Sequence, residues 1–379
     1  MILEPRQDGR YELNYGPHHP STHGVLRLLL TLRGEAVTNC EPVIGYLHRS
    51  VEKLIQDKPY LSILPYVDRL DYISSLIYEH AYVIAIEKLL KIDAPLRSKY
   101  IRVIMDELTR ISSHLMMIGT MSFDLGCLSL FLYCLEEREK ILQIFEEVTG
   151  ARMHPAYYIP GGVKGDLTPE HINKITKYLT QLQFLYDAID KLVLNNRIFK
   201  ERTKGIGIIS SELAIYSGIT GPNLRASGIK YDTRIDSQYG IYHLLELYHI
   251  TLQEGDCYSR LHMRFLEIKQ SVELIKQCIT QIEPGEFYEN SAENSMSSLR
   301  GGAQTNPQMQ ICTSCESTRG EVGIHLFTRN DNSRPYRLHF KSQSLLHIQI
   351  LKKIIPGNKL ADCPAILGSL DFLMGDCDR

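Results

Sequence analysis

Three histidines lie close together near the N-terminus, in the stretch Gly-Pro-His-His-Pro-Ser-Thr-His-Gly at residues 16–24. Histidine exchanges protons near neutral pH, and its neutral ring is a common metal ligand. Pro20 has no amide hydrogen and biases His19 towards an extended backbone. His19 and His23 therefore cannot form the i, i+4 pair that a helical zinc site of the HExxH type needs. The stretch instead predicts binding or proton chemistry on a loop, with an ordinary structural histidine as the alternative.

The nine cysteines are odd in number and scattered, which favours free thiols in a reducing compartment over a disulfide framework. Cys312 and Cys315 form the only Cys-x-x-Cys pair, and no second pair follows at the spacing of a zinc ribbon. Because a structural zinc ion normally takes four protein ligands, this pair is weak support for a metal site. The spacing typical of an iron–sulfur cluster is also missing.

The 379-residue chain is 44% hydrophobic and carries a formal net charge of -2, which suits one large domain or two to three closely associated ones. This balance argues against nucleic acid as the main partner. No apolar run reaches the roughly 20 residues of a spanning helix, and residues 1–8 show neither a signal-peptide core nor a Ser/Arg-rich presequence. We expect a soluble or peripheral chain whose membrane contact is indirect, through other subunits.

The hydrophobic periodicity predicts a mostly helical chain framed by two β segments. Residues 25–43 predict a hairpin that turns at 33–35, and residues 320–340 predict a second hairpin around 330–332. Long helices are expected between them over residues 68–90, 96–118, 129–149, 169–197 and 240–282. Tyr72 falls on the apolar stripe of the first of these helices, and Asp124 follows the end of the second.

Residues 16–27, GPHHPSTHGVLR, resemble the GPQHPxxHGVLR signature of one core family of respiratory complex I, that of the 49-kDa subunit. That family is related to the large subunit of NiFe hydrogenases. The resemblance continues in order through LHRSVEKL at 47–54, DRLDY at 68–72, DLG at 124–126, LEEREK at 135–140, GARMH at 150–154, PGGV at 160–163, NNRI at 195–198, GDCY at 255–258 and SRPYR at 333–337. The matched stretches look closest to mitochondrial versions.

NiFe hydrogenases hold their metals with two cysteine pairs. Their RxCGxC motif aligns with residues 69–74, and their DPCxxCxxH/R motif aligns with residues 371–379. The four cysteine positions are occupied here by Asp71, Ser74, Leu373 and Asp376. Since nickel in such a site needs soft thiolates, we expect no bound metal and no hydrogen chemistry.

The resemblance implies instead that the vacated metal cavity binds the headgroup of ubiquinone. His23 and Tyr72 are then the pair that hydrogen-bonds the quinone oxygens and supplies protons, and Asp124 is the carboxylate that pairs with His23. His19, Asp71 and Ser74 would support this site. Purely structural roles are the alternatives: a core tyrosine at Tyr72, a helix cap at Asp124 and a turn-fixing hydrogen bond at His19.

Arg49, Arg69 and His154 match family positions near a 4Fe–4S cluster that a small-hydrogenase-like partner subunit holds. Permanent positive charge there would stabilise the reduced cluster, and a titrating His154 would make its potential pH-dependent. Interface salt bridges are the alternative for the arginines, and a turn residue before Pro155 is the alternative for His154. The family commonly has Arg where Ile159 stands, so one charge near the cluster is missing here.

The resemblance implies an α+β, predominantly α-helical fold like that of the NiFe-hydrogenase large subunit. Residues 1–46 would form an N-terminal β-domain, and residues 47–379 a helical core with a C-terminal hairpin at about 320–341. The chain would be a peripheral-arm subunit of a proton-pumping NADH:quinone oxidoreductase, inactive alone.

Expected partners are the cluster-bearing subunit, other peripheral-arm subunits and a quinone-channel membrane subunit, with NAD and FMN bound elsewhere in the complex. The expected location is the matrix side of the mitochondrial inner membrane or, alternatively, a bacterial cytoplasmic-membrane face. The competing functions are a hydrogenase-type enzyme and a catalytically silent scaffold.

Overall fold

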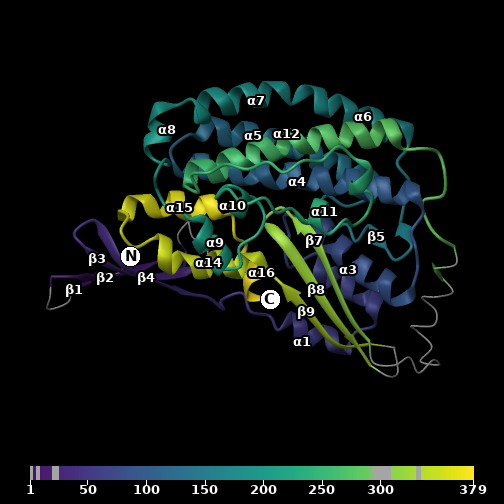
Figure 1. Ribbon diagram of the computed structural model, residues 1–379, viewed down its shortest axis with the longest axis horizontal. Coiled ribbons are helices and arrows are strands. Elements are labelled where there is room, and N and C mark those ends of the chain that lie inside the picture. Colours follow the sequence, from purple (N-terminus) through teal and green to yellow (C-terminus); the bar gives the residue numbers. More distant parts are fainter. Residues whose placement is uncertain (1–2, 6–8, 19–24, 291, 294–308, 330–333) are drawn as a thin grey trace.

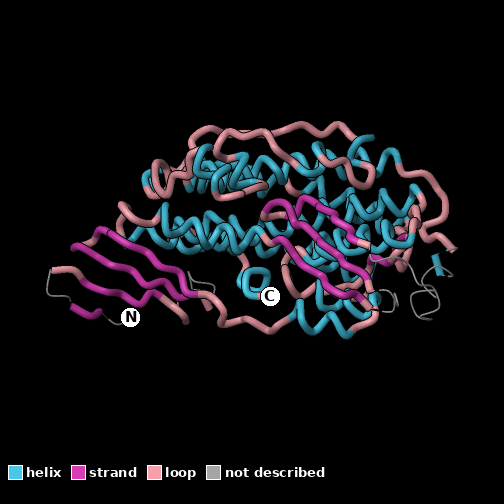
Figure 2. The backbone as a smooth tube through the Cα atoms, turned by 60° about the horizontal axis from the view of Figure 1, so that its bottom comes forward, coloured by secondary structure: helices cyan, strands magenta, loops and turns pink. Residues whose placement is uncertain are grey.

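The computed structural model describes residues 3–5, 9–18, 25–290, 292–293, 309–329 and 334–379, with only the backbone of residues 3–5. Long helices form a bundle, a three-stranded sheet lies across one side of it, and a four-stranded sheet extends from one end (Figure 1, Figure 2). The fold is therefore α+β and predominantly helical, as the sequence predicts.

The N-terminal sheet is antiparallel, with its strands in sequence order: β1 (Leu3–Pro5), β2 (Tyr11–Tyr15), β3 (Arg27–Arg33) and β4 (Ala36–Val43). The predicted hairpin at 25–43 is its β3–β4 half and is confirmed. Leu28, Leu30 and Leu32 alternate with more exposed residues along β3, which is the pattern of a sheet with one covered face. Helix α14 (Gln343–Ile354) packs against β4.

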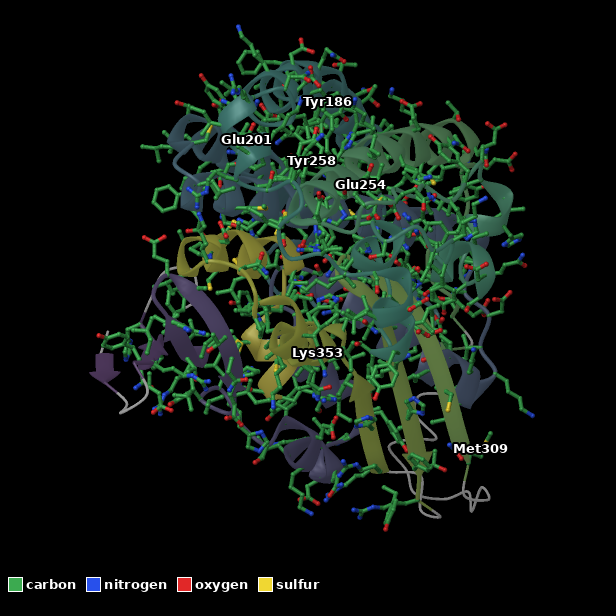
Figure 3. All side chains as sticks on the ribbon, turned by 60° about the vertical axis from the view of Figure 1, so that its left-hand side comes forward. Tyr186, Glu201, Glu254, Tyr258, Met309 and Lys353 are labelled. Carbon is green, nitrogen blue, oxygen red and sulfur yellow. The ribbon has the colours of Figure 1, made fainter. Side chains whose placement is uncertain are left out.

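The centre of the bundle consists of α3 (Ser75–Leu90), α4 (Leu96–Asp124), α5 (Leu128–Thr149) and α12 (Cys257–Gln281). Helix α4 packs against both α5 and α12 and is largely buried. The segment of α7 (Gln183–Ile189) and η4 (Asp190–Leu194) packs on α12. The Tyr186 ring of α7 packs edge-on against Phe265 of α12, and Tyr258 Oη of α12 donates to the Leu194 carbonyl of η4 at 3.0 Å (Figure 3). Within the described residues, no helix is long and apolar enough to cross a membrane.

Shorter helices connect these elements. They are α1 (Val51–Leu54), α2 (Leu64–Val67), α6 (Pro169–Gln181), α7 (Gln183–Ile189), α8 (Arg197–Glu201), α9 (Ser211–Tyr216), α10 (Pro222–Arg225), α11 (Thr233–Asp236), α15 (Cys363–Leu370) and α16 (Met374–Asp378). Single turns of 3-10 helix occur at η2 (Ile55–Asp57), η3 (Tyr60–Ile63), η5 (Tyr242–Leu244) and η6 (Leu360–Asp362), and a π-helical turn occurs at η4 (Asp190–Leu194).

Helix α4 does not end at Gly119, where the sequence places its end, but continues to Asp124. A Cβ atom at Gly119 would lie 3.1 Å from Cys134 Cβ and 3.4 Å from the Phe131 ring. This glycine therefore allows α4 and α5 to approach closely instead of terminating a helix. Gly150 does end α5 as predicted, with a left-handed φ of 81°.

Two other predicted helices are shorter than expected. The helix predicted over 169–197 is divided into α6, α7 and a π-helical turn. Of the helix predicted over 240–282, only Cys257–Gln281 is α-helical, and the earlier part contains one 3-10 turn at η5. Asp256 caps its first turn by accepting the Ser259 amide at 2.8 Å, and the preceding segment lies along α12, where Gln270 Nε2 donates to the Tyr248 carbonyl at 2.7 Å. The apolar pattern before residue 257 thus reflects packing on the core.

The C-terminal sheet contains β7 (Gln310–Ser317), β8 (Gly320–Thr328) and β9 (Pro335–Lys341) in antiparallel order. The strand pairing of the predicted second hairpin is confirmed as β8–β9, and its predicted turn around 330–332 lies outside the described residues. Strand β7 was not predicted. The tight turn between β7 and β8 places Thr318 and Arg319 inside the molecule, where both side chains are buried.

Candidate functional site

The turn between α2 and α3 carries four of the predicted site residues: Arg69, Asp71, Tyr72 and Ser74. Asp71 Oδ1 accepts hydrogen bonds from the amides of Ile73 and Ser74 at 3.2 and 3.1 Å, which is the geometry of an Asx turn. This turn postpones the start of α3 to Ser75, so the helix predicted from residue 68 is wrong for its first seven residues. Tyr72 lies on the turn instead of on a helical stripe, with 39% of its surface exposed.

A buried ion-pair network occupies the positions that align with the hydrogenase cysteines. Arg319 Nη1 donates to Asp71 Oδ2 at 2.6 Å, and Arg319 Nη2 donates to Asp371 Oδ1 at 3.2 Å. The hydroxyls of Ser74 and Thr318 are hydrogen-bonded at 2.6 Å. The guanidinium of Arg319 thus lies between two carboxylates.

The second pair of aligned positions is also engaged within the chain. Asp376 accepts from Tyr78 Oη at 2.6 Å and from the hydroxyl of Ser342. Leu373 is buried, and its amide donates to Ser344 Oγ at 3.1 Å. Each of the four aligned positions therefore makes defined contacts inside the protein.

Burial acts on Asp71 and Tyr72, two titratable groups of this network, in a common direction. Burial raises the pKa of Asp71, which Asp376 and Asp371 reinforce and Arg319 opposes. Burial likewise raises the pKa of Tyr72, with Arg319 lowering it and Asp71 raising it. The phenol of Tyr72 is therefore protonated at neutral pH and can donate its hydrogen.

The C-terminal helix α16 packs directly against the turn that carries Tyr72. A Cβ atom at Gly375 would lie 2.9 Å from the Leu70 carbonyl oxygen and 3.5 Å from Tyr72 Cε1. Only a glycine permits this approach without movement of the backbone. At the end of α16, Asp378 accepts the amides of Gly45 and Leu47 at 2.9 and 2.8 Å. Helix α16 thus contacts both the turn that carries Tyr72 and the segment around Gly45 and Leu47.

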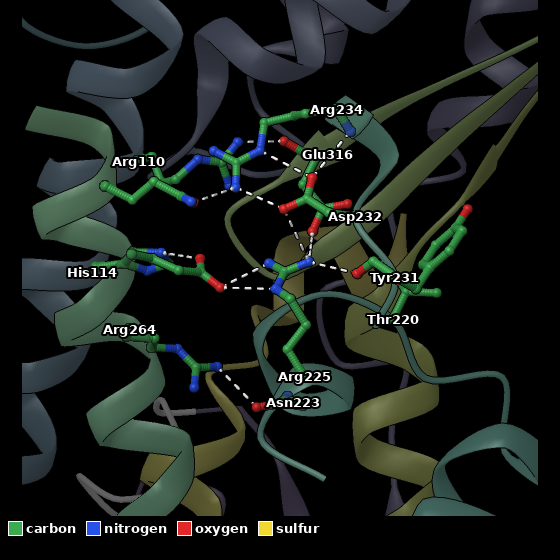
Figure 4. Close-up of polar contacts among 12 residues, drawn as sticks. Arg110, His114, Thr220, Asn223, Arg225, Tyr231, Asp232, Arg234, Arg264 and Glu316 are labelled. Carbon is green, nitrogen blue, oxygen red and sulfur yellow. Dashed lines mark hydrogen bonds and ion pairs between the residues drawn. The ribbon is translucent and has the colours of Figure 1, made fainter. Parts of the chain in front are cut away.

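A second network of buried charges positions the turn that carries Arg319 (Figure 4). Arg110 of α4 donates to the carbonyls of Glu316 and Ser317 at 2.7 and 3.2 Å. Arg225 joins Glu267 of α12 to Glu316 of β7, at 2.7 and 2.8 Å. Because these side chains are almost fully buried, losing one partner would leave an uncompensated charge in the core.

Arg49, Arg69 and His154 come together on the other side of the same turn. Arg49 Nη2 donates to the Arg69 carbonyl at 3.3 Å, and His154 Nδ1 lies 3.1 Å from the Asp68 carbonyl oxygen. His154 has a left-handed φ of 55° and lies in the irregular segment between α5 and β5 (Tyr158–Ile159). Burial and the charge of Arg69 lower the pKa of its imidazole, against the bond to the Asp68 carbonyl.

Asp124 is the last residue of α4 and is partly buried. The N-cap of the next helix is Cys127, so the capping role considered for Asp124 is wrong. His19 and His23 lie outside the described residues, and so their predicted contacts with Tyr72 and Asp124 stay predictions. The backbone leading to them is described to His18, which has a left-handed φ of 68°.

Sequence reasoning missed Arg319, Thr318, Tyr78 and the role of Asp371. A signal was present, because acids at two former cysteine positions need a compensating cation once they are buried. Arg319 stands in the segment CTSCESTRGE, which forms the end of β7 and the turn to β8.

Cys312 and Cys315 cannot hold one metal ion together. Cys312 is exposed and its Sγ lies 3.3 Å from His325 Nδ1, whereas Cys315 is buried.

Cys312 borders a cleft of about 740 Å³ between α3 and the C-terminal sheet. Although large, this cleft is lined by Lys88, Arg102 and Tyr239 and not by the predicted quinone-site residues.

Comparisons with known proteins find one family model and several relatives that are similar to this chain. Residues 124–379 match the family described as respiratory-chain NADH dehydrogenase, 49 Kd subunit. The chain is 41% identical to the D-type subunit of NADH-quinone oxidoreductase from Wolbachia pipientis wMel, over 97% of this chain and 98% of that protein. It is 42% identical to the same subunit from the Wolbachia of Brugia malayi and 40% identical to that from Ehrlichia chaffeensis, each over at least 97% of both chains.

Similarity over nearly the whole of both chains places the protein among the core subunits of respiratory oxidoreductases. It belongs to the family of the 49 kDa subunit of respiratory-chain NADH dehydrogenase.

Proposed function

We propose that this chain forms the headgroup site for a quinone in a proton-translocating NADH:quinone oxidoreductase, beside a 4Fe–4S cluster held by a partner subunit. The cluster would deliver electrons one at a time, and this chain would orient the substrate and supply protons. Ubiquinone is the proposed substrate. Tyr72 carries the proposal, because it presents a protonated, partly exposed phenol on a turn that buried ion pairs fix on the inner side.

Tyr72 would donate a hydrogen bond, and then a proton, to one quinone oxygen. His23 would serve the other oxygen, since imidazole can give up a proton and regain it at neutral pH. Asp124 would orient His23 and favour its protonated form. Asp71 and Ser74 support the site from within, and His19 would help to shape the loop opposite.

The site for the partner's cluster would lie against Arg49, Arg69 and His154. Exposed guanidinium groups on one surface suit an interface with an electron carrier that becomes more negative on reduction. Ile159, at the position usually held by Arg, removes one charge from this surface; its carbonyl accepts from Arg102 Nη2 at 3.0 Å. The remaining cations would still raise the potential of the cluster.

The partners are then the cluster-bearing subunit, other peripheral-arm subunits and a membrane subunit through which the quinone tail enters. Membrane contact would be indirect, either on the matrix side of the mitochondrial inner membrane or on a bacterial cytoplasmic-membrane face. The Wolbachia and Ehrlichia relatives are bacterial, which agrees with the second location. Bound NAD and FMN would belong to other subunits.

The test is to replace His23→Ala, Tyr72→Phe and Asp124→Asn separately in the assembled complex and to measure quinone reductase activity. Each should lower activity by about 10²–10⁴-fold, the range expected for loss of a proton-transfer group. Tyr216→Phe is the matched control, because Tyr216 is 88% exposed on α9. Normal activity in all three assembled variants would support a silent scaffold instead.

The role of His154 has its own test. In His154→Met, the potential of the partner's cluster, followed by redox titration at several pH values, should lose most of its pH dependence. An unchanged slope would remove His154 from this role without affecting the proton donors.

A further inference from the structure

The cleft of about 740 Å³ between α3 and the C-terminal sheet has no part in the proposed quinone chemistry. Helix α3 lies beside β7 and β8 (Figure 1), and the early turns of α4 and residues 237–240 complete the wall. Small-molecule sites in proteins typically have volumes of roughly 300–1,000 Å³. The cleft can therefore hold a ligand much larger than a simple ion.

Positive charge predominates in the lining of this cleft. Five lysine or arginine side chains line it against three acids, and each acid is paired with one of the cations. The pairs, with their N–O distances, are Glu87–Arg102 (2.7 Å), Asp93–Lys99 (2.6 Å) and Glu321–Lys341 (3.0 Å). Two positive charges therefore remain in excess.

The excess charge belongs to Lys88 and Lys91 at the end of α3. Both side chains are exposed, and neither forms an ion pair within the part of the chain that the structure describes. The negative end of the helix dipole accounts for cations at this position, but not for the cleft that they border. Because like charges close together at a helix end repel each other, a bound anion would stabilise both lysines.

The inner part of the cleft offers buried donors and apolar surface. Arg102 is 2% exposed, and its Nε is buried without a hydrogen-bond partner among the described residues. His80 Nδ1 is 2.5 Å from Asp106, which leaves Nε2 of the ring for another partner. Tyr239 and Ile84 contribute apolar surface to the lining. A ligand that meets these groups should combine acceptor oxygens with an uncharged, partly apolar portion.

We propose that this cleft binds a phosphorylated small molecule of nucleotide size. Its phosphate groups lie against Lys88 and Lys91 at the mouth, and its uncharged portion lies against Tyr239 and Ile84. Phosphate suits the site because it carries more negative charge than a carboxylate and has three strong acceptor oxygens. Lysine binds phosphate as a point charge, so no bidentate geometry is needed.

Binding is tested by calorimetric titration of the purified full-length chain with adenosine 5′-diphosphate. The wild type should bind, and the double variant Lys88→Gln, Lys91→Gln should bind at least about tenfold more weakly, as expected when charge-assisted hydrogen bonds are lost. Lys174→Gln, Lys177→Gln is the matched control, because these lysines are also three positions apart, on α6, and do not line the cleft.

Absence of binding to the wild type overturns the proposal, whatever the variants do. Equal weakening in the cleft variant and the control overturns it as well, since general electrostatic attraction would then explain the binding.

Further probes test the chemical class of the ligand on the wild-type chain. Pyrophosphate should bind, more weakly than adenosine 5′-diphosphate, and adenosine should not bind because it lacks phosphate. Adenosine that binds as tightly as the diphosphate overturns the role of the phosphate groups. Binding of phosphatidylglycerol vesicles or of polyglutamate in place of the diphosphate overturns the small-molecule assignment, in favour of a lipid surface or an acidic protein segment respectively.

Cys312 reports where the ligand lies, because its exposed thiol borders the cleft. A saturating concentration of adenosine 5′-diphosphate should slow the labelling of Cys312 by a neutral maleimide. Labelling of Cys127, which is partly exposed and does not line the cleft, should not change. Unchanged labelling of Cys312 while the diphosphate is bound overturns the proposed location. None of these measurements involves a quinone, so their outcome is independent of the proposed function.

Discussion

Replacing Arg319 by methionine is the most direct test of how the network beside Tyr72 is held together. Arg319 is 3% exposed, and its guanidinium contacts Asp71 at 2.6 Å and Asp371 at 3.2 Å. Without it, Asp71 loses its cation, and Asp371 keeps Arg264, 3.6 Å away, as its one ion-pair partner among the described residues. Removing one partner from a buried ion pair costs about 3–5 kcal/mol, so Arg319→Met should lower the free energy of unfolding by an amount in this range.

The loss should depend on pH in a defined direction. Burial and the neighbouring acids already raise the pKa of Asp71, and removing Arg319 raises it further. The folded variant therefore holds a proton on Asp71 that the unfolded chain has released, and its stability falls as the pH rises. The destabilisation should be larger at pH 8 than at pH 5, where Asp71 is neutral more often.

Urea denaturation of the full-length chain, followed by circular dichroism at both pH values, measures this effect. Adding Asp71→Asn to Arg319→Met should restore about 1–3 kcal/mol, because it removes the orphaned charge. Arg337→Met is the control: Arg337 is 46% exposed and pairs with Glu52, so its loss should cost at most about 1 kcal/mol. A loss of that size for Arg319→Met, equal at both pH values, would show that the guanidinium does not neutralise the site.

Three further outcomes can be checked on the same chain. Stability should fall between about pH 4 and 6 by on the order of 3 kcal/mol through Asp68, because the buried carboxyl holds a proton that the unfolded chain has released; urea titrations of Asp68→Asn should show a smaller fall by about that amount. Gly119→Val should lower the thermal midpoint by separating α4 from α5, at a cost of about 1–3 kcal/mol, whereas Gly285→Val, at an open position, should not. Alkylation of the native chain, followed by mass spectrometry, should label Cys312 before Cys363, because Cys312 is exposed, whereas Cys363 is buried and burial raises the pKa of its thiol to about 12.

Features with local signals were predictable from the sequence. The two hairpins follow from alternation and turn residues, and the end of α5 follows from Gly150, whose left-handed backbone suits a helix terminus. Family motifs selected Arg49, Arg69 and His154, which the fold does bring together. In each case a few neighbouring residues contain the information.

Features that depend on distant residues were not predictable in this way. Arg319 and Asp71 are 248 positions apart, and no local pattern pairs them. Gly119 resembles a helix terminator until Cys134 and Phe131 are seen against it. The segment before Cys257 has the apolar spacing of a helix, yet it owes its burial to contacts along α12.

The failure of the helix prediction at residues 68–74 has a physical consequence for the site. In a helix, Asp68, Asp71 and Tyr72 would share one face, because residues three and four positions apart are neighbours there. The turn made by the Asp71 carboxylate separates them: the Asp68 side chain is fully buried, Asp71 faces Arg319, and the ring of Tyr72 lies partly exposed beside α16. One carboxyl is then a buried acid whose pKa burial raises, while the other is ion-paired. A helix-restoring substitution such as Asp71→Ala should therefore disturb both environments at once, whereas Asp71→Asn, which can still accept the Ser74 amide, should disturb only the ion pair.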